Sequence, residues 1–504
     1  MRLGHYRVLL DCGLAVSDVK DIDPAAGAVD FVLCSHAHSD HGRGLWAFHQ
    51  RFPKVPIYAS EATAKLLPLN WLNEPEAQSV SFCQGLPWRS PIPLAENLTA
   101  ELWPAGHLPG ATCFVLSYAA PERTYRVVYT GDFFLSNARL VDGLPLNDLR
   151  GLHPDVLLLE GSYGIRRYPH RRQQENQLAE RINRAIADQK NVILPTPALG
   201  LGQELLMFLR SHHQFTGRKI DIWVDKTVAA GCDAYLDLLP HLPNSVQNFA
   251  QHQPLFWDER VFPRVRRLPP EGLAAVRFPA IVIAHRTPDL GQQLAEAAHP
   301  WMAFFPSEVQ LPPATQTVYE SQPDELKNRA TSSDPPSREP AALASTMWQR
   351  LSQALTAQSI GVEPYMLTLH CDGVGTTQLI HNLRPQHVVL VHGSPAHLAD
   401  LAGLEELQSR YQLHLPSPGH LVELPIGETF IQPEAPNQSY EGELSETPSG
   451  IYLMLPPALA QSESWKTLAE TGVIEAQWQG NELIIRGISQ DELMNLADSA
   501  PPEG

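Results

Sequence analysis

The stretch CSHAHSDHGRGL, Cys34–Leu45, places three histidines and one aspartate within six positions, directly after the apolar run FVL. Alternate residues of such a loop point to different sides, so His36 and His38 can grip one metal ion while Asp40 and His41 grip a second. Imidazole nitrogen with carboxylate oxygen favours zinc, with manganese or iron as alternatives. A polar loop that binds no metal can share this composition, so the companions of the stretch decide between the two interpretations.

Four apolar runs end in a residue suited to bind metal: DFVLCS leads to His36, RVVYT to Asp132, YMLTL to His370 and HVVLV to His392. Continuous apolar runs predict strands that are covered on both faces, and groups at their ends converge on one edge of a sheet. A further histidine, His107, follows a turn in PAGHLPGAT. The predicted site therefore has seven metal ligands: His36, His38, Asp40, His41, His107, Asp132 and His392.

Composition limits the class of protein. A chain of 504 residues with 43% hydrophobic content can bury a large core and is expected to hold more than one domain. No run of about 20 apolar residues and no signal peptide is visible, and the six cysteines are scattered without a CxxC pair, so we expect no membrane partner, reduced thiols and a cytoplasmic location. The net charge, 37 minus 55 or −18, argues against a protein that coats nucleic acid non-specifically.

Two polar segments interrupt the apolar pattern. Residues 311–341 are rich in Pro, Ser and charged residues and are predicted to form a flexible, solvated loop. Residues 432–450 form a second such segment, which precedes strand-like IYLML, helix-like SWKTLAETG and strand-like NELIIRGI. We interpret these last elements as a small C-terminal α+β appendage.

The order and context of these motifs resemble a known family. Together with LLDCGL, which carries Asp11, the histidine and aspartate motifs resemble the metallo-β-lactamase superfamily. The stretches PDVLLLEGSYGIRRYPHRRQQE, NVILPTPALGLGQELLMFL and LHCDGVGTTQLI, the last followed by VLVHGS, resemble its β-CASP branch of RNA-processing nucleases, which includes ribonuclease J and the polyadenylation-factor endonuclease. The resemblance runs from the first residues to His392 and is weak between about residues 220 and 360.

The resemblance implies an α/β fold, in which a metallo-β-lactamase αββα sandwich is interrupted by an inserted α/β β-CASP domain. The active site would lie in the cleft between the two domains. The expected boundaries are residues 1–163 for the first part of the sandwich, 164–361 for the insert, 362–431 for the return of the sandwich, and 432–504 for the linker and C-terminal appendage.

The resemblance also implies roles for the site residues. One zinc would be held by His36, His38 and His107, the other by Asp40, His41 and His392, with Asp132 bridging both. His392 occupies the position at which the RNA-cleaving members carry histidine, whereas the DNA-repair members typically carry valine. The remaining catalytic candidates besides Asp40 are Asp11, which would orient the cluster, Glu160, and His370, which Glu160 would hold as a proton donor.

The chemistry can also be built from the residues. Two metals about 3.5 to 4 Å apart can activate a shared water and neutralise charge on a phosphodiester. The leaving oxygen then needs a proton, which a histidine steadied by a carboxylate can give, and His370 with Glu160 suits this role. Simpler interpretations stay open at this point: Asp11 as a turn cap, His370 as a core histidine and Glu160 as a plain carboxylate at a strand end.

The densest basic segment of this acidic chain, IRRYPHRR, follows Glu160 directly. Charge runs are usually solvated surface, but beside the expected cleft arginine is also suited to grip phosphate oxygens. The candidate substrate residues are Arg166, Arg167, Arg171 and Arg172.

We therefore predict a hydrolase: a ribonuclease that uses two zinc ions, or manganese, to cleave single-stranded RNA by internal or end-first cutting. Three alternatives remain: a small-molecule metallo-hydrolase of the same superfamily, a DNA-directed β-CASP nuclease, and a non-catalytic RNA-processing subunit. An insert of nearly 200 residues disfavours the first, and a complete set of ligands disfavours the last. The family resemblance also allows a homodimer.

Overall fold

The computed structural model describes residues 1–20, 22, 29–286, 290–295, 300–306 and 360–426, together with four strands beyond residue 440. The chain divides into two compact units, Met1–Pro433 and Glu434–Gly504. The predicted solvated segment at 311–341 and the helix-like stretch SWKTLAETG lie outside the described residues.

The first sheet of the larger unit has five strands in the order β1-β2-β3-β4-β5. Strands β1 and β2 are antiparallel, and the remaining neighbours are parallel. The loop after β3 begins the metal-ligand stretch. The strands are β1 (Arg2–Leu3), β2 (Tyr6–Leu10), β3 (Phe31–Leu33), β4 (Ile57–Ser60) and β5 (Cys83–Leu86).

A second sheet has seven strands in the order β18-β17-β10-β9-β8-β7-β6. Neighbours from β18 to β9 are parallel, and those from β9 to β6 are antiparallel, so β7, β9, β10 and β17 run in one direction. The strands are β6 (Ile92–Ala95), β7 (Leu98–Pro104), β8 (Thr112–Ala119), β9 (Thr124–Tyr129), β10 (Val156–Glu160), β17 (His387–Val391) and β18 (Gln412–His414).

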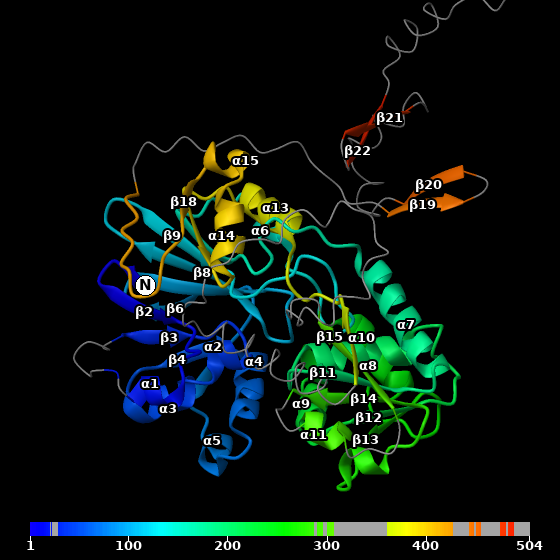
Figure 1. The fold of residues 1–504 in the computed structure, drawn as a ribbon. Coiled ribbons are helices and arrows are strands. Elements are labelled where there is room, and N and C mark those ends of the chain that lie inside the picture. The colour runs from blue at the N-terminus through cyan, green and yellow to red at the C-terminus, as the bar shows by residue number, and fades with distance from the viewer. Residues whose placement is uncertain are drawn as a thin grey trace, which may run out of the picture. The chain divides into compact units, whose positions relative to one another are not determined.

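These two sheets pack face to face, with helices on their outer sides (Figure 1). Strand β17 shows why its sequence is continuously apolar. Val389 packs in the core shared by the two sheets, whereas its neighbours Val388 and Leu390 belong to the core that includes Leu379 and Ile380 of helix α13 (Gly373–Leu383). Because successive side chains of a strand alternate between faces, a strand covered on both faces must be apolar throughout. The αββα sandwich expected from the sequence is present.

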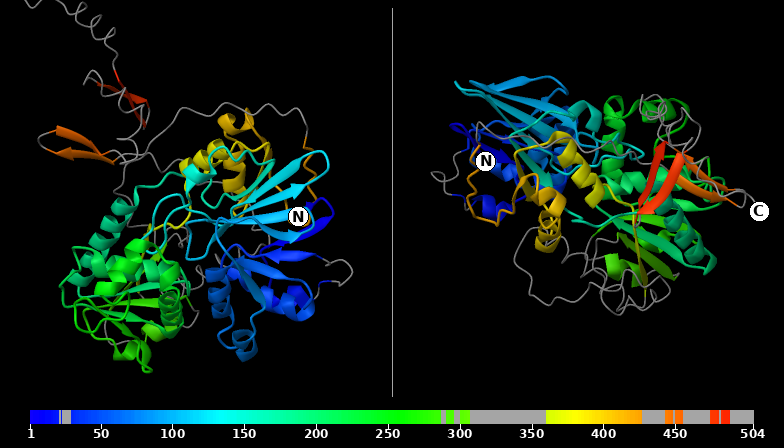
Figure 2. Two further views of the ribbon diagram at one scale, coloured as in Figure 1. Left: turned by 180° about the vertical axis from the view of Figure 1, so that it is seen from behind. Right: turned by 90° about the horizontal axis from the view of Figure 1, so that it is seen from above.

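A third sheet lies between β10 and β17 in the chain, and its six strands are all parallel in the order β13-β12-β14-β11-β15-β16. Figure 2 shows its elements grouped beside the two sheets of the sandwich. Strand β11 is central and buried at every residue. The strands are β11 (Asn191–Thr196), β12 (Asp221–Val224), β13 (Arg264–Arg267), β14 (Ala280–His285), β15 (Trp301–Pro306) and β16 (Gly361–Tyr365).

One predicted strand is wrong. The run YMLTL, residues 365–369, is not the strand that leads to His370; the strand is β16, Gly361–Tyr365, which pairs with β15 at the edge of the third sheet. Pro364 is tolerated there because an edge strand needs hydrogen bonds on one side only. Residues 366–370 cross from the third sheet to the metal-ligand region without regular structure.

Helices cover the sheets and connect their strands. Among the described residues, no helix is long and apolar enough to span a membrane. The α-helices are α1 (Val16–Lys20), α2 (Ser39–Gly42), α3 (Leu45–Arg51), α4 (Glu61–Leu66), α5 (Pro75–Ser79), α6 (Leu146–Leu149), α7 (Arg171–Ala187), α8 (Leu201–Ser211), α9 (Lys226–Asp237), α10 (Asn244–His252), α11 (Leu290–Ala295), α13, α14 (Pro395–Ala402) and α15 (Glu405–Gln408), and the 3-10 turns are η1 (Leu67–Trp71), η2 (Leu239–His241) and η3 (Gly272–Ala275).

The smaller unit contains two antiparallel strand pairs, β19 with β20 and β21 with β22. Strands β20 and β22 fall on the predicted runs IYLML and NELIIRGI, whereas β19 and β21 were not predicted. The strands are β19 (Glu443–Thr447), β20 (Gly450–Met454), β21 (Ile474–Gln479) and β22 (Glu482–Gly487).

Candidate metal centre

The loop after β3 folds back on itself through the single helical turn α2, which brings the ring of His41 against the ring of His36. The side-chain amide of Asn70 donates to the carbonyl of Ala37, 2.9 Å away, and this hydrogen bond holds the loop in place. Gly13 allows the close approach of the preceding segment, because a Cβ atom there would lie 1.6 Å from the Asp40 carbonyl oxygen. The loop conformation is thus fixed from two sides.

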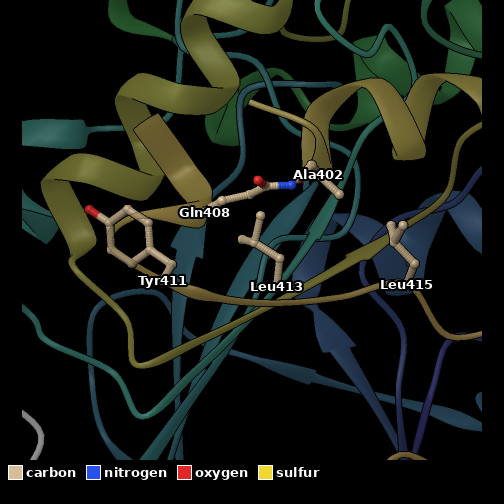
Figure 3. Close-up of a pocket in the computed structure, with 5 residues that line it drawn as sticks. All are labelled: Ala402, Gln408, Tyr411, Leu413 and Leu415. Atoms are coloured by element: carbon tan, nitrogen blue, oxygen red, sulfur yellow. Dashed lines mark hydrogen bonds between the residues drawn. The ribbon is translucent and has the colours of Figure 1, made fainter. Parts of the chain in front are cut away.

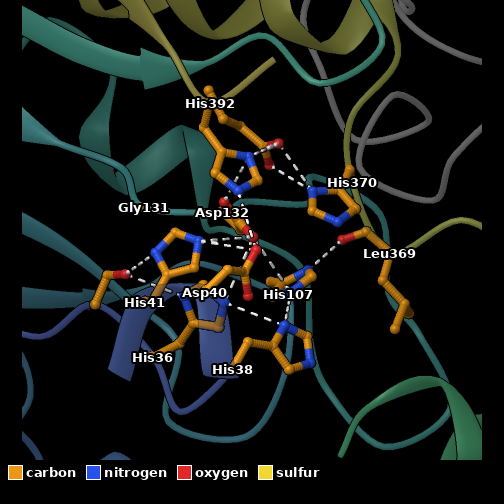
Figure 4. Close-up of polar contacts among 12 residues, drawn as sticks. His36, His38, Asp40, His41, His107, Gly131, Asp132, Leu369, His370 and His392 are labelled. Carbon is orange, nitrogen blue, oxygen red and sulfur yellow. Dashed lines mark hydrogen bonds and ion pairs between the residues drawn. The ribbon is translucent and has the colours of Figure 1, made fainter. Parts of the chain in front are cut away.

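Two ligand clusters meet at Asp132 (Figure 4). The side chain of Asp132 is buried, and its Oδ2 lies 3.4 Å from His36 Nε2 and from His41 Nε2, and 3.7 Å from His107 Nε2. Its Oδ1 lies 3.4 Å from His392 Nδ1. Ligand atoms lie within 4.8 Å of one another in each of three sets: His36, His38, His107 and Asp132; Asp40, His41 and His392; and Asp132, Glu160 and His370. The first two sets are called the ligand clusters below.

Four of the imidazoles hydrogen-bond through the nitrogen that faces away from the cluster. His38 Nε2 lies 3.3 Å from the Leu199 carbonyl oxygen, and His107 Nδ1 lies 2.8 Å from that of Leu369. Because a carbonyl only accepts, each of these nitrogens carries the proton, and the other nitrogen keeps its lone pair for a metal. The corresponding acceptors are the Ser35 hydroxyl for His36, at 3.0 Å, and the Asp11 carboxylate for His41, at 2.7 Å.

Burial keeps three of these imidazoles neutral. It lowers the pKa of His36 and of His107 well below the ordinary value, and it lowers the pKa of His38 to about 4. Neutral imidazole is the form that binds metal, since protonation removes the lone pair. These three side chains are therefore ready to act as ligands at pH 7.

Charge is concentrated at His41 and the carboxylates that face it. Burial opposes protonation of His41, but the carboxylates of Asp132 and Asp11 raise its pKa well above the ordinary value. Burial alone would raise the pKa of Asp132, yet the imidazoles of His392, His41 and His36 hold this pKa well below its usual range. Buried carboxylates that stay ionised need a positive partner, which a divalent cation would supply in place of the proton on His41.

Two buried polar atoms of the site lack a hydrogen-bond partner among the described residues, and a metal ion could take that place. His41 Nε2 and Asp132 Oδ1 are buried and make no hydrogen bond within the described part of the chain. An unsatisfied buried polar atom costs about 1–3 kcal/mol, so such pairs are rare without a ligand. Both atoms face the clusters, and the donors are imidazole nitrogens and carboxylate oxygens, which suit zinc or manganese. The residues present therefore fit divalent metal ions.

Asp11 lies behind the ligands. It adopts a left-handed backbone conformation with φ of 59°, and its carboxylate accepts from the Ser35 backbone and hydroxyl, at 2.5 and 2.7 Å, from Tyr129 and from His41. Tyr129 and His41 belong to other parts of the chain, so these contacts exceed those of a simple turn cap. The arrangement orients His41 toward the cluster.

Glu160 and His370 form a pair beside the ligands. Glu160 Oε2 lies 2.8 Å from His370 Nδ1, and its Oε1 accepts from the Phe133 backbone at 2.7 Å. The His370 ring lies against the ring of His107, with centroids 4.4 Å apart. The carboxylate is buried, with 3% of its side chain exposed, whereas 21% of the imidazole is exposed. Solvent therefore reaches the His370 ring, whereas the Glu160 carboxylate is covered.

Two family models match the parts of the chain that supply these residues. The model of the Metallo-beta-lactamase superfamily matches residues 2–161, and that of the Zn-dependent metallo-hydrolase RNA specificity domain matches residues 361–413. The uncharacterized protein sll0514 of Synechocystis sp. is 48% identical to the chain, over 99% of this chain and 86% of that protein. The chain belongs to the metallo-β-lactamase superfamily.

More distant relatives are named as ribonucleases, which is consistent with the β-CASP branch of the superfamily. The probable RNase MJ4 of Methanocaldococcus jannaschii is 28% identical over 41% of this chain, and Ribonuclease TTHA0252 of Thermus thermophilus is 32% identical over 47%. These matches cover 52% and 56% of the relatives' own lengths, about half of each. Five of the six strands of the third sheet, β11 to β15, lie between the two segments matched by the family models, and β16 lies at the start of the second segment.

The four arginines predicted to bind substrate differ in solvent exposure in this metallo-β-lactamase protein. Arg166 and Arg167 are exposed in the loop after β10, and Arg172 is exposed in the first turn of α7. Arg171 instead points inward, with 15% of its side chain exposed, and pairs with Glu204 at 2.7 Å. Its guanidinium is engaged within the protein, which departs from the expected grip on substrate.

Sequence reasoning missed several groups that hold the site. The carbonyls of Leu199 and Leu369 left no signal, because any residue type supplies a backbone carbonyl. Ser162 was also missed: its hydroxyl donates to Glu160 and lies 3.1 Å from His392 Nδ1. Its place two residues after Glu160 in EGSYG is the one available hint.

A hollow of about 500 Å³ lies elsewhere in the sandwich, beside β18 (Figure 3). None of its lining residues belongs to the ligand clusters or to the pair of Glu160 and His370. We therefore place the chemistry at the metal centre and not in this hollow. The lining residues are Ala402, Gln408, Tyr411, Leu413 and Leu415.

Metal removal is expected to destabilise the fold. Zinc added to the metal-free protein should raise its melting temperature by several degrees, because binding at about 1,000 times Kd contributes about 4 kcal/mol. Differential scanning calorimetry of chelated and zinc-loaded protein measures this shift. Asp132→Ala, which removes the carboxylate that contacts residues of both clusters, should show little of the increase. Equal melting temperatures with and without zinc would count against the site.

Replacing Asp11 by asparagine should weaken metal binding by about ten-fold or more, since partners that orient a ligating histidine typically contribute 10- to 100-fold. The amide keeps the size of the side chain but removes the charge that faces His41. Competition with a chromophoric chelator measures the affinity. Asp18→Asn, at an exposed position of α1, is the matched control and should bind metal like the wild type. Unchanged affinity in Asp11→Asn would show that Asp11 does not orient His41.

Proposed function

We propose that the chain is a ribonuclease that hydrolyses phosphodiester bonds of single-stranded RNA, with two zinc ions, or manganese, in the ligand clusters. One observation carries the proposal: a buried carboxylate, Glu160, holds a partly exposed imidazole, His370, against the ligand His107. His370 also lies in the segment matched by the RNA specificity model, and relatives named as ribonucleases support the same activity.

Divalent ions held by these side chains would supply Lewis-acid activation of water and of the phosphate ester. The protein's own contribution is proton transfer. Glu160 accepts from His370 Nδ1, which fixes the orientation of the ring, so Nε2 is the nitrogen that gives a proton to the leaving oxygen. The hydroxyl of Ser162 donates to Glu160 and keeps the carboxylate in place.

The preference for RNA rests on His392 and on local positive charge. The resemblance links a histidine at this position to the RNA-cleaving members, and His392 lies here between Asp40 and Asp132. A chain with a net charge of −18 needs local cations to hold a polyanion. We assign Arg166, Arg167 and Arg172 to phosphate contacts, because they are exposed and follow Glu160 closely in the chain. Arg171 does not belong to this group.

Cleavage of a 5′-labelled single-stranded RNA, with the matched DNA strand alongside, tests the proposal. Wild type should cut RNA and leave most DNA intact, and the product ladder separates internal from end-first cutting. His370→Gln should keep its metal but lose about 10²- to 10⁴-fold in rate, the usual contribution of a general acid. Asp132→Ala should lose metal and activity together.

The control is His252→Gln, at an exposed histidine at the end of α10, which should cut RNA at the wild-type rate. Metal-loaded wild type that leaves both RNA and DNA intact would overturn the proposal and favour a small-molecule hydrolase or a subunit that requires a partner. Equal cleavage of RNA and DNA would overturn the substrate preference alone.

A further inference from the structure

Four charged side chains join the first domain to the inserted domain outside the ligand clusters. Arg139, in the loop after Asp132, forms two hydrogen bonds with the carboxylate of Glu175 on α7, at 2.9 and 2.5 Å. Glu204 on α8 accepts from the backbone of Arg139 and Leu140, at 3.0 and 2.8 Å, and from Arg171 on α7 at 2.7 Å. Both carboxylates are buried, so their charges depend on these partners.

Two side chains in the first turn of α7 also form hydrogen bonds with the backbone of Thr368. Arg171 Nη1 donates to the Thr368 carbonyl at 2.9 Å, and Gln174 accepts from the Thr368 amide at 3.2 Å. Residues three apart on a helix lie on one face, so Arg171 and Gln174 reach the same peptide segment together. Thr368 is thereby held through both its donor and its acceptor.

The residues that follow Thr368 belong to the metal centre. The Leu369 carbonyl accepts from His107 Nδ1 at 2.8 Å, and His370 pairs with Glu160. The Cys371 amide then donates to the Phe133 carbonyl at 3.1 Å. One short, irregular segment therefore orients a metal ligand and carries the proton donor, although no sheet or helix of its own supports it.

We propose that Arg171 is a positioning residue: by fixing Thr368 it sets the orientation of the Leu369 carbonyl toward His107 and of the His370 ring toward Glu160. Glu204 holds the guanidinium in place for this task, since it lies between Arg171 and the loop of the first domain. The effect on His370 rests on the proposed ribonuclease function, whereas the effect on His107 is independent of the substrate.

The test compares Arg171→Met with Arg184→Met, a control at an exposed arginine near the end of the same helix. Two readouts are needed: zinc affinity by chelator competition, and kcat and KM for single-stranded RNA. Arg171→Met should bind one of its two zinc ions about ten-fold more weakly, as loss of an orienting partner implies. At saturating zinc, its kcat should fall at least ten-fold while KM stays within two-fold. The control should match wild type in all three quantities.

Arg171→Lys provides a second variant if Arg171→Met does not fold. The ammonium keeps a charge for Glu204, but the shorter side chain lacks the fork that reaches the Thr368 carbonyl at the same time. It should therefore show the same loss of zinc affinity with a near-normal melting temperature. Wild-type zinc affinity and kcat in the variant that folds would overturn the proposal, and a raised KM alone would return Arg171 to substrate binding. If wild type cuts no RNA, the zinc readout still decides the positioning role.

Discussion

The structure depends on one buried carboxylate. Asp132 is 2% exposed, and its carboxylate oxygens lie within 3.7 Å of four imidazoles, so it contacts residues of both ligand clusters. A buried, ionised carboxylate is stable only where cations or hydrogen-bond donors surround it. The strand ends around Asp132 must therefore place such groups on several sides of it. Because β7, β9, β10 and β17 run in one direction, their carboxyl ends bring His107, Asp132, Glu160 and His392 to one edge of the sandwich.

The segment that contains the third sheet contributes a backbone contact to the candidate metal centre. The Leu199 carbonyl, in the turn between β11 and α8, orients His38. That turn passes so close that a Cβ atom on Gly200 would lie 3.3 Å from His38 Nε2, at a backbone φ of 84° that favours glycine. The metal ligands of the first domain therefore take part of their orientation from a segment of the insert.

The sequence located residues that the structure brings together in the candidate site, but not the backbone groups that contact them. The runs FVL, RVVYT and HVVLV could be assigned to β3, β9 and β17 because strands covered on both faces are apolar throughout, and their ends located His36, Asp132 and His392. YMLTL is equally apolar, but it is buried as an irregular crossing, and composition alone does not distinguish the two. The sequence could not show that Arg171 pairs with Glu204. The orientation of helix α7, which turns Arg171 toward Glu204, is set by tertiary packing.

One backbone link between the candidate metal ligands and the pair of Glu160 and His370 passes through Phe133. Phe133 follows the ligand Asp132; its amide donates to Glu160 at 2.7 Å, and its carbonyl accepts from Cys371, which follows His370. A shift of Asp132 would therefore displace both members of the acid pair through the backbone, without any change in their side chains. This covalent and hydrogen-bonded chain helps to set the spacing between the candidate ligand clusters and His370.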